Sequence, residues 1–163
     1  MGLDLPSELE RLLNDLGFTW PEVDETDLFS LGSTWVQFGG TLQGVQQTAQ
    51  TAANQVSEHN QGAAVEAFVA KWSGDKAPAH VVGDLANGAE LGGAAIMMCA
   101  GLVLGLKINT IVNLGILLAE IVEALATAVP TFGASLAEIP VFKEIAQRVI
   151  GAIINEVVSA ILG

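Results

Sequence analysis

The chain has 163 residues, of which 51% are apolar and only 15% are charged, so its composition excludes a disordered chain and fits one domain with a sizeable core. Its net charge of −12 excludes a general nucleic-acid binder, because such proteins need a basic face. A single cysteine excludes an intrachain disulfide and a cysteine-based zinc site.

The N-terminal segment, residues 1–25, predicts an acidic helix followed by an extended corner at Trp20–Pro21. Pro6 suits the first turn of a helix, and Gly17 suits the position after its end. Leucines at helical spacing form one stripe: Leu5, Leu9, Leu12, Leu13 and Leu16. No segment led by Lys or Arg opens the chain, so we expect no conventional signal peptide.

The segment from about 26 to 58 predicts a long helix with a coiled-coil-like seam. Its apolar residues alternate at spacings of three and four, and we call this set the α-seam: Leu28, Leu31, Trp35, Phe38, Leu42, Val45, Ala49, Ala52 and Val56. The α-seam is either an intramolecular core or, in part, a surface that meets another chain. Gly39 and Gly40 weaken the helix by about 1 kcal/mol each, so we expect tertiary packing to hold this turn.

A turn is predicted at three residues that favour chain reversal: Asn60, Gln61 and Gly62. Helical spacing resumes over about 62–75, where Phe68 and Trp72 share a face. Two helices joined by a short turn form an αα-hairpin, so we assign residues 26–89 to a helical hairpin.

Residues 90–129 predict very apolar helices, with Lys107 as the single charged residue of 91–119. Gly101 and Gly105 form a GxxxG pair, which supports close helix contact in water or in lipid. This stretch is either a buried helix pair or a hairpin that inserts into a bilayer, with Lys107 at its tip or snorkelling. Glu120 and Glu123 lie on a polar stripe and argue against a passive lipid-facing span; in an oligomer they would face a wet lumen.

The last helix, about 141–162, is amphipathic, with a wide apolar stripe opposite charged and amide side chains. The periodicities together predict an all-α fold, a hairpin or bundle of five or six helices with a very apolar C-terminal half. We expect residues 1–163 to form one all-helical domain, in which 90–163 supplies the apolar helices.

The sequence offers no catalytic, cofactor-binding or metal-binding residues that we can assign. Glu120 and Glu123 have no neighbouring base on their polar stripe, His59 and His80 lack metal spacing, and Cys99 lies in an apolar run. We therefore expect a protein that is not an enzyme and uses no cofactor.

The segment NQGAAVEAFVAKW resembles the turn of the WxG, or early-secreted-antigen, class of helical hairpins that type VII systems secrete. Gly62 takes the glycine position, Phe68 the aromatic position on the second helix, and Asn60 stands where the family has tryptophan. A second WxG string, Trp72-Ser73-Gly74, follows later. The segments LPSELERLLNDLGFTWPEVDETDLFSLGSTW and TFGASLAEIPVF extend the resemblance to the WxG-like N-terminal domain of actinobacterial polymorphic toxins.

This resemblance implies an all-helical, non-catalytic export and assembly module that acts by helix pairing and normally precedes a toxic enzyme. It implies a protein partner or a homo-oligomer, contact with the secretion machinery, and a secreted or cell-envelope location. The chain contains no tyrosine, so the Tyr-x-x-x-Asp/Glu secretion signal does not lie within these residues; a partner supplies it or the route differs. The alternative is a membrane-inserting pore or translocation element that delivers a toxin.

Overall fold

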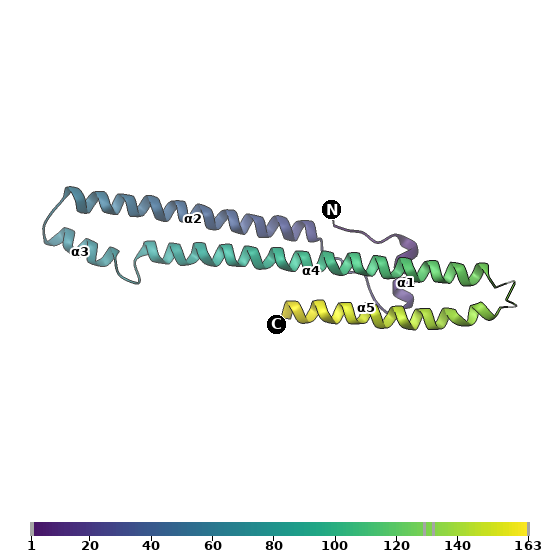
Figure 1. The fold of residues 1–163 in the computed structure, drawn as a ribbon. Coiled ribbons are helices and arrows are strands. Elements are labelled where there is room, and N and C mark those ends of the chain that lie inside the picture. Colours follow the sequence, from purple (N-terminus) through teal and green to yellow (C-terminus); the bar gives the residue numbers. More distant parts are fainter. Residues whose placement is uncertain (1, 129, 132, 163) are drawn as a thin grey trace. The chain divides into compact units, whose positions relative to one another are not determined.

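The computed structural model describes residues 2–128, 130–131 and 133–162, and within them all regular structure is helical. The elements in chain order are α1 (Ser7–Asp15), α2 (Glu25–His59), α3 (Ala63–Trp72), α4 (Pro78–Ala126), a 3-10 helix η1 (Ala134–Glu138) and α5 (Ile139–Leu162) (Figure 1). The all-α class predicted from the periodicities is confirmed.

The chain divides into two compact units, which are described separately. The hairpin unit comprises Leu28–Met98, and the α4–α5 unit comprises Met1–Asp27 together with Cys99–Gly163. Helix α4 contributes its N-terminal half to the first unit and its C-terminal half to the second.

In the hairpin unit, α2 runs antiparallel to α3 and to the first half of α4 (Figure 1). Glycines form the contact between α2 and α4: a Cβ atom on Gly39 would lie 2.9 Å from the Ala86 carbonyl oxygen, and one on Gly93 would lie 2.6 Å from the Gly32 oxygen. No real side chain tolerates such distances, so the absence of Cβ atoms lets the two backbones approach closely.

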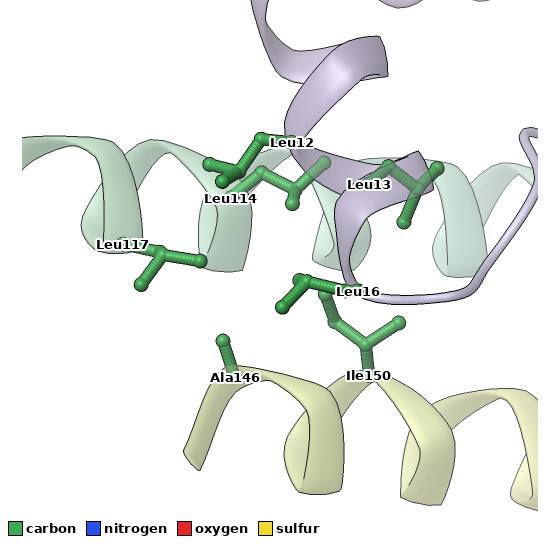
Figure 2. Close-up of a cluster of buried hydrophobic side chains, with 7 residues drawn as sticks. All are labelled: Leu12, Leu13, Leu16, Leu114, Leu117, Ala146 and Ile150. Carbon is green, nitrogen blue, oxygen red and sulfur yellow. The ribbon is translucent and has the colours of Figure 1, made fainter. Parts of the chain in front are cut away.

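In the α4–α5 unit, leucines from α1 fill the space between α4 and α5 (Figure 2). The buried cluster consists of Leu12, Leu13 and Leu16 from the α1 segment, Leu114 and Leu117 from α4, and Ala146 and Ile150 from α5. The leucine stripe predicted for the N-terminal helix thus supplies the core of this unit. Burial of each such side chain stabilises the fold by about 1.5–3 kcal/mol.

Helix α4 corrects the predicted boundaries of the apolar half. It runs without a break from Pro78 to Ala126, so it is not interrupted near residue 90, and Lys107 is not the tip of a hairpin. Ala86 and Ala89 are buried in the hairpin unit, and this packing holds the helix through the Asn87–Gly88 pair that sequence propensity disfavours. The chain reverses after Ala126 instead, and α5 runs back along α4 within the α4–α5 unit (Figure 1).

Candidate helix-pairing site

The turn of the hairpin begins where α2 ends at His59. The Asn60 side-chain amide donates to the Val56 carbonyl oxygen at 2.9 Å, which satisfies one of the free acceptors at the end of the helix. Gly62 has φ +115°, a backbone conformation that L side chains rarely adopt, and its carbonyl accepts the N–H groups of Val65 and Glu66 to start α3. The three residues predicted as a turn therefore reverse the chain.

A hollow of about 670 Å³ lies beside this turn. Its lining combines turn residues with the exposed side of α3, including Ser57, Gln61, Val65 and Val69. Phe68 and Trp72 lie farther along α3, with ring centroids 5.7 Å apart in a stacked arrangement. Trp72 Nε1 donates to Gln50 Oε1 at 3.0 Å, so this hydrogen bond links α3 to α2.

The α-seam is largely exposed to solvent in this structure. Trp35 is 43% exposed, Phe38 44% and Val45 54%, and no member of the set is buried. Trp35 and Phe38 contact each other edge to face, with centroids 6.3 Å apart. Within the hairpin unit the α-seam is therefore not an intramolecular core, and the alternative of a surface that meets another chain remains.

The residues of α2 that contact α4 come directly after α-seam residues in the sequence. Its contact positions include Gly32, Gly39, Gln43 and Gln46, whereas the α-seam has Leu31, Phe38, Leu42 and Val45. One residue corresponds to a rotation of about 100° around a helix. Small and amide residues thus make the internal contact, and the large apolar residues are left on the neighbouring face.

The other neighbouring face of the α2–α4 contact is polar. A cleft of about 330 Å³ there is lined by Gln47, His80, Asp84 and Asn87 among others. Within the contact itself, Gln43 Nε2 donates to Glu90 Oε1 at 2.7 Å. The hairpin unit therefore has one polar flank and one apolar flank, which is the pattern of a helix pair with a single side for association.

In the α4–α5 unit, Lys107 forms a buried ion pair with Glu25. Lys107 Nζ lies 2.8 Å from Glu25 Oε2 and donates to the Val23 carbonyl oxygen at 2.7 Å, and both charged residues are at most 4% exposed. The ammonium also lies 5.6 Å from the centroid of the Trp20 ring. Lys107 therefore holds the N-terminal segment on α4 and does not snorkel.

Electrostatics favour the charged form of the acidic residues at this junction. The hydrogen bond from Lys107 keeps the pKa of Glu25 below its ordinary value, although burial acts in the opposite direction. Burial also raises the pKa of Asp24, but the N–H groups that Asp27, Thr26 and Gly2 donate outweigh it and lower that pKa. Asp24 thus caps the start of α2 as a carboxylate.

The GxxxG pair does not mediate a close helix contact within the described chain. A Cβ on Gly101 or Gly105 would meet nothing within 4 Å. Both glycines line a groove of about 450 Å³ between α4 and the C-terminal part of α5. Glu123 is exposed and Glu120 is half-buried, and neither belongs to a described ion pair.

Two described helical stretches are long and apolar enough to cross a membrane. Their most apolar windows have mean hydropathies of 1.9 in Pro78–Ala126 and 1.6 in Ala134–Leu162, and only 17% and 11% of these windows are buried. Along α4 the exposed residues include a set of large apolar side chains: Ile108, Val112, Ile116, Val122 and Leu125. In the described residues, no cluster of His, Cys, Asp and Glu could hold a metal ion.

Sequence reasoning missed the internal contact and the ion pair. The glycines that form the contact, Gly32 and Gly39, are seven residues apart, and this heptad spacing of glycine was the available signal. The partnership of Glu25 and Lys107 joins residues 82 apart, for which the sequence carries no local signal.

In the comparison with known proteins, the family model of the WXG100-like domain matches residues 4–149, a range that includes parts of both units. No curated protein and no solved structure matches the chain.

Proposed function

The chain belongs to the WXG100-like family, and from this membership and the exposed α-seam we propose that it is a non-catalytic module for export and assembly that acts by helix pairing. The module would belong to a type VII-like secreted actinobacterial toxin, whose toxic domain lies outside these residues. It would be secreted or reside in the cell envelope, without a conventional signal peptide.

The single observation that supports this proposal most is the solvent exposure of the α-seam. A soluble monomer rarely leaves a continuous row of tryptophan, phenylalanine and valine in water, and such patches mark association sites. The turn hollow near Gly62, about 670 Å³ in volume, would be a contact for the secretion machinery. Both features belong to the hairpin unit.

Export in an actinobacterial host tests the proposal. We expect the chain to leave cells that carry a working type VII apparatus and to remain inside cells whose secretion ATPase is inactive. Val45→Glu should reduce both partner association and export, because it places a charge on the apolar surface. Gln37→Glu adds the same charge to an exposed position of α2 outside the α-seam and should leave both unchanged.

Two results would contradict this function. One is export that does not depend on the ATPase, and the other is equal export of the Val45→Glu and Gln37→Glu variants. The first result would show that the chain does not use the type VII apparatus. The second would show that the α-seam takes no part in export.

A second candidate function is a membrane-inserting translocation element. The two apolar stretches of low burial, in α4 and α5, favour it. In that case the exposed apolar row on α4 would contact lipid, and the GxxxG groove would accept another helix. Leakage of a dye from anionic vesicles over pH 4–7.5 would support this function, and no release under any of these conditions would exclude it.

A further inference from the structure

Residues 2–25 form a loop whose two ends meet at neighbouring carboxylates. The Gly2 N–H donates to Asp24 Oδ2 at 2.8 Å, and the Leu3 N–H donates to Glu25 Oε1. Helix α1 lies between these two ends, so the loop is closed by its own hydrogen bonds. We call residues 2–25 the N-terminal strap, and all of them belong to the α4–α5 unit.

The Glu25–Lys107 pair joins both ends of the strap to α4. Glu25 accepts from the Leu3 N–H through Oε1 and from the Lys107 ammonium through Oε2, and Lys107 also donates to the Val23 carbonyl oxygen. Lys107 is the single charged residue of 91–119, so no neighbouring charge in this stretch of α4 replaces it. Loss of the Glu25 charge therefore weakens both ends of the strap at once.

The strap covers an apolar groove in the α4–α5 unit. Side chains from α4 and α5 form this groove, and the leucines of the α1 segment fill it (Figure 2): Leu114, Leu117, Ala146 and Ile150. On the α5 side, Gln147 Nε2 donates to the Leu16 carbonyl oxygen at 3.0 Å, and Lys143 lies 3.6 Å from an Asp15 carboxylate that is 66% exposed. Exposed ion pairs add little stability, so the leucines and the buried Glu25–Lys107 pair hold the strap in place.

The strap has little regular structure of its own. Helix α1 has nine residues, which is too short for a helix that is stable alone in water. Residues 18–24, between α1 and α2, have no regular structure. The strap can therefore leave the groove as a local opening that keeps α4 and α5 helical.

We propose that the N-terminal strap is a releasable cover, which the Glu25–Lys107 pair holds over the apolar groove and which leaves the groove when Glu25 loses its charge. A neutral Glu25 leaves the Lys107 ammonium without its counter-charge at a site that is 3% exposed, and opening returns this ammonium to water. The open groove then presents Leu114 and Ile150 to apolar ligands. The device goes beyond the export function, and it does not depend on the α-seam.

Acid is the condition that removes the Glu25 charge. The hydrogen bond from Lys107 keeps the pKa of Glu25 below its ordinary value, so the strap stays closed from neutral pH down to about 4.3 and is released as the pH falls through the lowered pKa. Other charged groups also lie on the strap or face it from α4 and α5, and the variants below separate them from Glu25: Asp4, Glu8, Glu10, Arg11, Asp15, Glu22, Asp24, Lys107 and Lys143.

Trp20 reports the position of the strap, because it is half-buried and its ring centroid lies 5.6 Å from Lys107 Nζ. The chain has three tryptophans, so Trp35→Phe with Trp72→Phe leaves Trp20 as the single emitter. Between pH 6 and pH 3, we expect its emission to shift to the red and its quenching by acrylamide to rise about twofold, because a local opening exposes the ring. Emission of the uncharged dye Nile red should rise over the same pH range as the groove opens.

Three variants in this background test the role of the charge. Glu25→Gln should show at pH 6 the Trp20 quenching that the parent reaches only at pH 3. Glu144→Gln, which breaks the exposed pair with Arg148, is the matched control and should keep the pH profile of the parent. Glu25→Gln with Lys107→Met removes both buried charges, so its strap should stay closed at pH 3. Circular dichroism should show that the long helices persist in every case.

Three results would overturn the proposal. The first is equal Trp20 quenching of Glu25→Gln and the parent at pH 6, and the second is acid release of the strap in the double variant. The third is a loss of total helicity that follows Trp20 exposure in the parent, since the strap would then not open separately. If Glu25→Gln does not fold, the double variant decides the question, because it leaves no unpaired buried charge.

Discussion

Gly62 is the residue whose backbone conformation determines the reversal of the hairpin. Its φ of +115° lies where a Cβ causes strain, although a Cβ there would meet no atom within 4 Å. Gly62→Ala should therefore destabilise the protein by about 1–2 kcal/mol through backbone strain alone. Equilibrium urea denaturation, followed by circular dichroism at fixed protein concentration, measures this change.

Gly88→Ala is the matched control for that substitution. Gly88 also has open space around it, but it lies inside α4 with helical backbone angles. Alanine should stabilise this position by up to about 1 kcal/mol, because it has the higher helix propensity. Changes of the same sign and size in the two variants would show that the turn does not need a positive φ.

The ion pair of Glu25 and Lys107 predicts a pH dependence at the residue scale. The pKa of Glu25 is lower in the folded state, so its carboxylate stabilises the fold above the unfolded pKa of about 4.3. This contribution is lost as the pH falls through the folded pKa. In thermal melts, acidification from pH 6 to pH 3 should therefore lower the Tm of the wild type more than that of the Glu25→Gln, Lys107→Met double variant.

The single variant Glu25→Gln should be the least stable at pH 7. It leaves the Lys107 ammonium buried without its counter-charge, for which about 3–5 kcal/mol is typical. Glu144→Gln breaks the exposed pair with Arg148 and should change stability by less than about 1 kcal/mol. Equal losses in these two variants would mean that burial of the Glu25 pair has no energetic consequence.

At the scale of elements, neighbouring glycines in α2 have opposite roles. A Cβ on Gly39 would lie 2.9 Å from the Ala86 carbonyl oxygen, whereas a Cβ on Gly40 would meet nothing within 4 Å. Gly39→Ala should therefore destabilise the hairpin unit by about 1–3 kcal/mol by forcing α2 away from α4. Gly40→Ala should stabilise it slightly through helix propensity. Denaturation midpoints of the two variants that move in the same direction would contradict the glycine contact.

The same glycines explain what the sequence could and could not predict. Apolar spacing in α2 identified the helix and the row of large residues, because periodicity reports which positions are apolar. It does not report which apolar face is used inside the chain. Glycine contributes little to an apolar pattern, so the pattern does not identify the face around Gly32 and Gly39 as the internal contact. The same pattern allows the α-seam to be interpreted as core.

The continuity of α4 escaped prediction for a related reason. Asn87 and Gly88 have low helix propensity just before the predicted boundary at residue 90, and Lys107 is a charge in an apolar run, so local rules favour a boundary at the first place and a tip at the second. Burial of Ala86 and Ala89 and the ion pair with Glu25 are tertiary contacts that override those preferences. By contrast, the turn at Asn60–Gly62 follows from local chemistry, which a single sequence carries.

At the scale of the whole molecule, the two units rely on different kinds of packing. The α4–α5 unit has a cluster of buried leucines, whereas the hairpin unit has glycine contacts and an exposed apolar row. The first unit therefore gains its stability from internal burial, and the second has more to gain from a partner. This division agrees with a module whose α4–α5 unit is stabilised by its own core and whose hairpin unit associates with a partner.

Leu114→Ala tests whether the units are energetically separate. Leu114 of α4 is fully buried in the cluster that α1 and α5 share, so its truncation should destabilise the α4–α5 unit by about 2–5 kcal/mol. Native-state hydrogen exchange should then show faster exchange in α1, α5 and the second half of α4, with unchanged protection in α2. Leu118→Ala removes the same atoms from a position of α4 that is 38% exposed, and it should alter exchange little. If Leu114→Ala lowered the protection of α2 equally, the two units would unfold as one, and association of a partner through the α-seam would depend on the leucine cluster as well.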